Sequence, residues 1–132
     1  MDVDRLRRLS LFGELDHHDL SSIARWAREV LVAAGDPLIE QGELPYELFV
    51  LEEGTAEVVH DDAPVATLGP GDVVGEMGLL QLRRRWATVR ATSPVCAIAL
   101  DTDDLAQLTE QMPEVAARLQ EIMARRQREN EA

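Results

Sequence analysis

The stretch GEMGLLQLRRRWATVRA, residues 75–91, decides the interpretation of this chain. It opens with a glycine, continues with an apolar run long enough for one helical turn, and ends in an alternating segment typical of a β-strand. A helix start exposes unpaired backbone N–H groups, which together with the local dipole form a site for an anion. The stretch therefore predicts an anion-binding turn between two strands.

Two charged residues of this stretch have separate expected roles. Arg85 comes just before the returning strand, so its guanidinium can reach back over the turn and bind a phosphate through two parallel hydrogen bonds. Glu76 would repel that phosphate, and we therefore interpret it as the acceptor for a hydroxyl of the same ligand. The plainer alternatives are a solvated surface arginine and a carboxylate that stabilises a helix start.

Turn residues recur roughly every ten residues on both sides of this stretch, between about residues 30 and 100. The runs between them, such as residues 48–51 and 56–59, are rich in Val, Leu and Phe. This pattern predicts a mainly β domain, namely an antiparallel β-roll or jelly-roll-like barrel.

Helices are predicted on both sides of the β region. Asp16 followed by Asp19 is typical of a helix start, and Pro113 suits the first turn of another helix. Either Asp101 or Thr102 can begin a helix that continues to Met112. We expect a single domain over residues 1–132, with helices at about 4–29, the β-roll with its short phosphate-binding helix at about 30–100, and C-terminal helices at about 102–130.

Composition limits the function further. The 132 residues include 13 Lys plus Arg and 25 Asp plus Glu, a net charge of −12, which disfavours binding to nucleic acid or anionic membranes. The single cysteine, Cys96, lies in an apolar alternating run and is expected to be a small buried side chain. No secretion signal or membrane-spanning run is recognised, so we expect a cytoplasmic protein.

Residues 75–80, followed by Arg85, Ala87, Thr88 and Val89, resemble the phosphate-binding cassette of cyclic nucleotide-binding domains. These are the sensor domains of catabolite-activator-like regulators, cyclic-nucleotide-dependent kinases and gated channels. Residues 35–42, 46–54 and 68–72 are similar to the barrel signatures of that family in order and spacing. The resemblance covers about residues 10–130.

The resemblance implies a role for each matching residue. Glu76 would accept the ribose 2′-hydroxyl, Arg85 would pair with the cyclic phosphate, and backbone amides around Gly78 and Leu79 would complete the anion cradle. The helix from Pro113 would be the hinge and lid. The full predicted ligand-binding set is Val73, Gly75, Glu76, Met77, Gly78, Leu79, Arg85, Trp86, Ala87 and Val89, with Ile122, Met123 and Arg126 as lid candidates.

Trp86 departs from the family pattern. The family usually has a small Ala, Ser or Thr directly after the cassette arginine, and that side chain helps to select adenine or guanine. A tryptophan there could stack on the base, fill the pocket and exclude the nucleotide, or turn outward. The adenine-versus-guanine rule therefore does not carry over to this chain.

We predict a non-catalytic regulatory module that binds a cyclic nucleotide, with cAMP favoured and cGMP as the alternative, and that signals through its C-terminal helix to an effector outside this chain. The alternative is a non-binding interaction module of the same fold with Trp86 blocking the pocket. A third alternative, a catabolite-activator-type regulator, requires a DNA-binding segment after the C-terminal helix, so the chain is expected to be either a sensor fragment or a stand-alone module.

No cofactor other than this ligand is expected, and neither is a metal. Of the three histidines, His17, His18 and His60, only His60 lies in the β region, next to a predicted hairpin tip. No Ser-His or Cys-His arrangement suggests catalysis. Homodimerisation through the helix at 113–130 is left open, because its apolar stripe is short.

Overall fold

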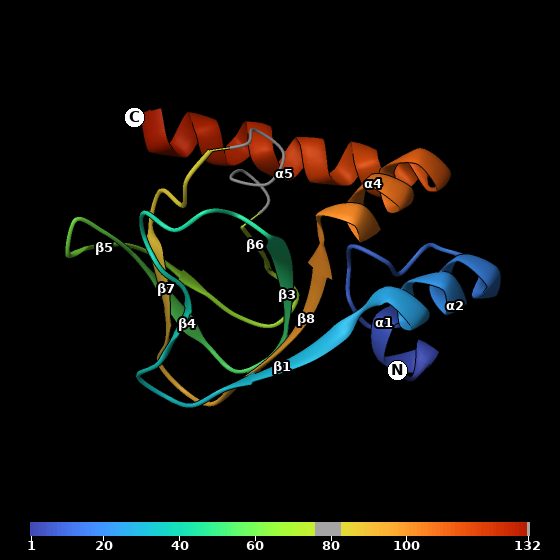
Figure 1. The fold of residues 1–132 in the computed structure, drawn as a ribbon, viewed down its shortest axis with the longest axis horizontal. Helices are drawn as coiled ribbons and strands as arrows, with labels where there is room; N and C mark the ends of the chain where they lie inside the picture. The colour runs from blue at the N-terminus through green and yellow to red at the C-terminus, as the bar shows by residue number, and fades with distance from the viewer. Residues whose placement is uncertain (76–82, 132) are drawn as a thin grey trace. The chain divides into compact units, whose positions relative to one another are not determined.

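The computed structural model describes residues 1–75 and 83–131, with side chains described as far as Arg125 in the last helix. The chain divides into two compact units, and each is treated by itself. One unit is residues 28–100, and the other combines residues 1–27 with the residues from Asp101 onward. Figure 1 labels most of their strands and helices. The expectation of one domain over residues 1–132 stays a prediction.

The unit of residues 28–100 is built from two four-stranded sheets, in which the paired strands run antiparallel (Figure 1). One sheet has the order β1-β8-β3-β6 and the other the order β2-β7-β4-β5. The strands are β1 (Arg28–Val32), β2 (Pro37–Ile39), β3 (Glu47–Glu53), β4 (Ala56–His60), β5 (Ala63–Leu68), β6 (Val73–Val74), β7 (Thr88–Ala91) and β8 (Val95–Asp101).

The predicted antiparallel β-roll is confirmed, but the prediction of a barrel is wrong. The described strands form two separate sheets that are not closed into a barrel. Barrel closure requires continuous hydrogen bonding around every seam, with a matching strand tilt and register. Turn spacing along a sequence predicts how many strands form, but it does not specify these long-range pairings.

Apolar side chains from both sheets form the core of this unit. Phe49, Leu51 and Val74 from one sheet contribute to the same buried cluster as Ile39 and Val89 from the other. Each of these residues follows the alternation of a strand, in which every second side chain points to one face. The cluster therefore identifies the inner face of each sheet, and this face is the reference for placing the site residues.

The β4–β5 hairpin ends at Asp61 and Asp62, as the sequence predicted. Both residues have positive φ angles, 49° and 66°. Positive φ at both central residues is the conformation of a type I′ turn, whose twist matches the twist of the flanking strands. The hairpin consequently fixes His60 as the last residue of β4.

The second unit contains the helices α1 (Val3–Arg7), α2 (His17–Trp26), α4 (Thr102–Gln111) and α5 (Pro113–Glu131). The predicted caps are confirmed: the Asp16 side chain accepts a hydrogen bond from the backbone N–H of Asp19, and Asp101 forms a reciprocal capping box with Asp104. The helical segment expected to reach residue 29 ends earlier, at Trp26. Ala27 is extended, and β1 begins at Arg28.

Arg118 of α5 links the helices to the segment that precedes α2. Its guanidinium donates hydrogen bonds to the carbonyl oxygens of Ser10, at 2.6 Å, and Leu11, at 3.2 Å, and lies 2.7 Å from the carboxylate of Glu14. Within the described part of the chain, no helix combines the length and the apolar character that crossing a bilayer requires.

Candidate functional site

The site is centred on Arg85, the arginine that the sequence singled out. The residue is only 8% exposed. Nη1 donates a 2.7 Å hydrogen bond to the carbonyl oxygen of Gly75, and Nη2 donates to the carbonyl oxygen of Glu47. A buried guanidinium is retained in a fold only where hydrogen bonds replace its lost hydration. The two carbonyls therefore hold the cation at the point where β6 ends.

The main chain of Arg85 is held as firmly as its side chain. Its N–H donates to the carbonyl oxygen of Glu43, and its carbonyl accepts from the N–H of Gly42, both at 2.8 Å. Arg84 donates from its side chain to the carbonyl oxygen of Gly42 at 2.9 Å. These contacts anchor the segment before β7 to the residues that follow β2.

Gly75 is required by the close approach of the guanidinium. Its φ angle is +85°, and a Cβ atom at this position would lie 2.6 Å from Nη1 of Arg85. Glycine adopts this backbone conformation without the steric cost that a side chain would add. The first residue of the quoted stretch and its third arginine are therefore packed directly against each other.

Two glutamates lie near this cation. The carboxylate of Glu47 forms an ion pair with Arg28, while the carbonyl of Glu47 accepts from Arg85. The pKa of Glu43 is raised above 4.5, chiefly by a hydrogen bond with the Glu40 side chain, and the positive charge of Arg85 opposes this shift. Arg28 and Arg85 therefore each interact electrostatically with a nearby glutamate.

Four predicted ligand residues, Glu76, Met77, Gly78 and Leu79, lie outside the described residues, and so does the predicted phosphate-binding helix. Their roles remain predictions. Ala87 is described and buried, between Arg85 and the start of β7. Gly75 and Arg85 are the two predicted ligand residues that the described structure joins by a hydrogen bond.

Val73 and Val89, both in the predicted ligand-binding set, differ in their relation to the inner face. Val89 belongs to the inner cluster, together with Val74 and its cross-strand partner Phe49. Val73 pairs with Val50 and precedes Val74 on the same strand, so its side chain points to the opposite face. The inner-face residue of β6 is therefore Val74. Sequence reasoning chose its neighbour because register was not available.

Trp86 is not buried. It is 45% exposed, and its ring lies flat on the imidazole of His60, with ring centroids 4.0 Å apart and an interplanar angle of 6°. This position does not fit the alternative in which the indole fills and blocks the pocket. In the sequence, His60 was considered only as a possible metal ligand. The one feature that could have pointed to it as a site residue was its position beside the predicted hairpin tip.

The lid candidates lie on α5. Ile122 and Met123 are half-buried, and the side chain of Arg126 is outside the described part of the helix. A break in helical geometry precedes α5, since Met112 has φ −128° and ψ 77° and Pro113 begins the next helix. The roles of lid and hinge stay predictions, as does a homodimer through this helix.

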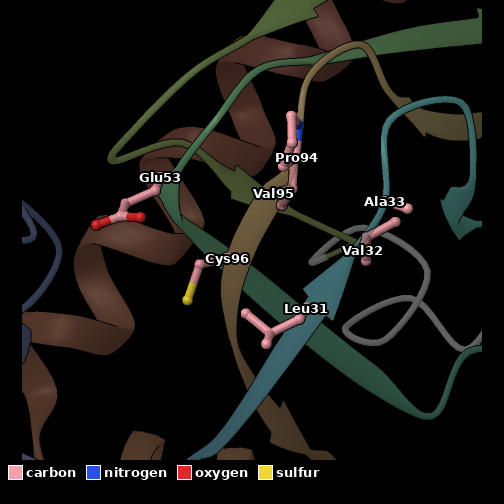
Figure 2. A pocket seen from close by; sticks show the side chains of 7 residues that line it. All are labelled: Leu31, Val32, Ala33, Glu53, Pro94, Val95 and Cys96. Carbon is pink, nitrogen blue, oxygen red and sulfur yellow. The ribbon is translucent and has the colours of Figure 1, made fainter.

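A separate pocket of about 330 Å³ lies beside β1 and β8 (Figure 2). Leu31, Glu53 and Cys96 are among its lining residues, which include none of the predicted ligand-binding residues. Cys96 is buried, as predicted, and its sulfur lies 3.3 Å from a carboxylate oxygen of Glu52. Within residues 1–75 and 83–131, no group of three or more His, Cys, Asp or Glu is placed to hold a metal ion.

Residues 29–112 match the family model of the cyclic nucleotide-binding domain. The chain therefore belongs to the cyclic nucleotide-binding domain family, as the resemblance of its cassette and barrel signatures indicated.

Particular relatives come from regulatory proteins. The chain is 34% identical over 91 residues, 69% of its length, to a cAMP-dependent protein kinase regulatory subunit of Yarrowia lipolytica. The crystal structure of the Thermus thermophilus catabolite activator protein matches with a TM-score of 0.80 and 30% identity, covering 92% of this chain and 59% of that chain.

A third match shows the fold alone. The regulatory subunit of a cAMP-independent protein kinase A from Trypanosoma brucei has a TM-score of 0.82 and 24% identity, covering 91% of this chain and 43% of that chain. The present chain spans only 24% of the Yarrowia lipolytica kinase subunit. The activities and partners of these longer proteins therefore involve residues outside the region that matches the present chain.

Proposed function

We propose that this chain is a regulatory domain that binds a cyclic nucleotide, with cAMP as the favoured ligand and cGMP as the alternative. Arg85 pairs with the cyclic phosphate, Glu76 accepts the ribose 2′-hydroxyl, and the backbone amides around Gly78 and Leu79 complete the anion site. The domain carries out no chemical step of its own. Its output is passed to an effector domain or protein.

The observation that carries this proposal is the position of Arg85. Arg85 is 8% exposed as a residue, and its guanidinium, oriented by two carbonyl oxygens, needs little reorganisation to receive an anion. Guanidinium groups bind phosphate oxygens through two parallel hydrogen bonds. Gly75 supports the same role, because its lack of a side chain leaves room for the guanidinium.

The choice of cAMP is supported by relatedness. The name of the Yarrowia lipolytica relative identifies it as the regulatory subunit of a cAMP-dependent kinase. The trypanosome protein of the same fold is described as cAMP-independent, so fold alone does not decide the ligand. Direct measurement of both nucleotides is therefore part of the test.

Signalling is proposed to pass through α5. Pro113 starts this helix directly after the non-helical Met112, and such a break is a natural hinge because few hydrogen bonds cross it. Ile122, Met123 and Arg126 are the candidates for closing over the ligand. Amide hydrogen exchange of residues 113–125 with and without nucleotide tests this step, and the proposal expects slower exchange in the bound state.

Isothermal titration calorimetry tests the central role of Arg85. Wild type, Arg85→Ala and the control Arg83→Ala are titrated with cAMP and cGMP; Arg83 is a neighbouring exposed arginine. A charge-assisted hydrogen bond contributes about 1.5–3 kcal/mol, so Arg85→Ala is expected to weaken binding by about tenfold to a hundredfold. Arg83→Ala is expected to bind like wild type.

Two results would contradict the proposal in different ways. Absence of binding heat for wild type at millimolar ligand would favour the non-binding interaction module. Binding by wild type with unchanged affinity in Arg85→Ala would leave the domain a nucleotide sensor but remove Arg85 as its phosphate ligand. Melting curves of each variant without nucleotide control for loss of folding.

A further inference from the structure

Trp86 and His60 lie together at one end of the β2-β7-β4-β5 sheet. His60 ends β4, two residues beyond Val58, which packs against the inner cluster. Because every second residue of a strand shares a face, His60 lies on the same inner side. Val58 pairs with Val89 in β7, and Trp86 lies just before that strand. The Trp86 ring stacks on His60 at this end of the sheet, next to the last apolar pair of the inner face.

His60 holds both the ring and the main chain of Trp86. Besides the parallel stack, Nδ1 of His60 lies 2.6 Å from the carbonyl oxygen of Trp86. A carbonyl oxygen can only accept, so Nδ1 is the donor. Two contacts of different kind, one to the indole and one to the backbone, restrict the indole to one orientation.

His60 is itself braced by the hairpin tip. Its Nε2 lies 3.3 Å from a carboxylate oxygen of Asp61. Asp61 exchanges two hydrogen bonds with the Gln41 side chain, at 2.7 and 3.0 Å, and the N–H of Gln41 donates to the hydroxyl of Thr88 at 3.0 Å. Three segments distant in sequence thus converge to position one indole ring.

Arg85 and Trp86 are adjacent in sequence but contact different sheets. The guanidinium bonds to carbonyls at the start of β3 and just after β6, which belong to one sheet, whereas the indole lies on the last residue of β4, in the other. The phosphate and base of a nucleotide are joined through one sugar. A cation and an aromatic ring on neighbouring residues therefore match the two ends of such a ligand.

We propose that His60 is a positioning residue that holds Trp86 so that the indole stacks on the base of the bound nucleotide, favouring purines over pyrimidines. This inference rests on the proposed function. Every base has a π-face, and a larger ring system shares more of the indole surface. His60 acts through Trp86 and needs no contact with the ligand of its own.

The test compares cAMP, cGMP and the pyrimidine nucleotide cUMP by calorimetry on wild type, Trp86→Ala and His60→Ala. Loss of stacking is expected to weaken purine binding by about tenfold to a hundredfold in Trp86→Ala, with a smaller loss for cUMP. For His60→Ala we expect about a twofold to tenfold loss for purines. The conservative variant His60→Phe keeps a ring under the indole and should recover part of that loss.

The ratio of purine to pyrimidine affinity distinguishes positioning from mere structural support. A structural defect lowers the melting temperature and weakens all three ligands equally, while loss of the indole contact narrows the ratio. His17→Ala serves as the control, because His17 is an exposed histidine at the start of α2. Its affinities and ratio are expected to match wild type.

Fluorescence supplies a readout that is independent of affinity. In a Trp26→Phe background, Trp86 is the remaining tryptophan, and its emission is expected to change when cAMP binds. The same change should be smaller in the His60→Ala variant. Wild-type binding with an unchanged ratio in both Trp86→Ala and His60→Ala overturns this inference alone, whereas wild type that binds none of the three nucleotides overturns the proposed function as well.

Discussion

The carbonyl oxygen of Gly75 accepts a 2.7 Å hydrogen bond from Nη1 of Arg85, ten residues later in the chain. A Cβ atom on residue 75 would approach that same nitrogen to 2.6 Å. The glycine that opens the cassette and the arginine proposed to bind phosphate therefore occupy a shared space. A change in the size of one side chain displaces the other.

Gly75→Ala is expected to lower both stability and nucleotide affinity. Alanine at φ +85° is strained, and its methyl group displaces the guanidinium, so we expect a loss of about 1–3 kcal/mol in the free energy of unfolding. Urea denaturation and calorimetry with cAMP measure the two effects. Gly69→Ala is the control, because nothing lies within 4 Å of a Cβ there; equal behaviour of the two variants would contradict the expectation.

Gly54→Ala is expected to destabilise the protein more than Gly35→Ala. Both glycines have φ +91°, but a Cβ on residue 54 would lie 2.2 Å from the carbonyl oxygen of Pro94, whereas nothing lies within 4 Å at residue 35. The comparison separates backbone strain from steric overlap, and the overlap is expected to add about 1–3 kcal/mol. Thermal melting of both variants provides the measurement, and matching melting temperatures would refute the predicted overlap.

Arg118→Met is expected to loosen the helical unit. The change keeps the apolar stem but removes the hydrogen bonds to the carbonyls of Ser10 and Leu11 and the ion pair with Glu14. We expect a loss of about 1–3 kcal/mol in the free energy of unfolding, because the carbonyls lose their partner. Arg125→Met on the exposed side of α5 is the control. If chemical denaturation shows the same stability for both variants, the contacts of Arg118 with residues 10–14 do not stabilise the unit.

Asp104 is expected to make stability depend on pH in the acid range. Burial raises its pKa above 3.8, the charge of Asp101 adds to this, and a hydrogen bond from the N–H of Asp101 opposes it. The folded state then binds the proton more tightly than the unfolded state. This contribution therefore lowers stability as the pH rises from 3.8 through the folded pKa, and the loss is complete above it.

Asp104→Asn removes that titration. The difference in unfolding free energy between wild type and Asp104→Asn should change as the pH rises from 3.8 through the raised pKa of folded Asp104, and be constant above it. Urea denaturation at a series of pH values measures it. Asp103→Asn, at the neighbouring exposed position, is the comparison. A wild-type curve parallel to that of Asp104→Asn throughout would show that Asp104 does not contribute.

Local features of the fold were predictable from sequence because they depend on neighbouring residues. The caps at Asp16 and Asp101, the helix start at Pro113 and the hairpin tip at Asp61 each follow from backbone preferences of a few adjacent residues. Helix α2 ended three residues before the predicted limit, because the chain at Ala27 is extended and continues into β1. Helix ends are less well specified by periodicity than helix centres.

The candidate site was predictable only in part. The cassette spacing identified Arg85 and Gly75, whose hydrogen bond the structure describes. It did not reveal the carbonyl of Glu47 as a partner, since a backbone acceptor has no side-chain signature. It also included Val73 in the ligand-binding set, whereas strand register puts its neighbour Val74 on the inner face.

Residue order alone was enough to predict the family, the antiparallel strands flanked by helices, and Gly75 and Arg85 as cassette residues of an expected anion site. The family and the cassette follow from the resemblance of the sequence signatures, whereas the strands and helices follow from turn residues, periodicity and caps, which act over a few positions. Three features emerged from the folded chain alone: the sheets stay unclosed, Val74 rather than Val73 faces inward, and Trp86 lies on His60. Such relationships depend on the register of strands far apart in the chain, where a shift of one residue reverses every side chain.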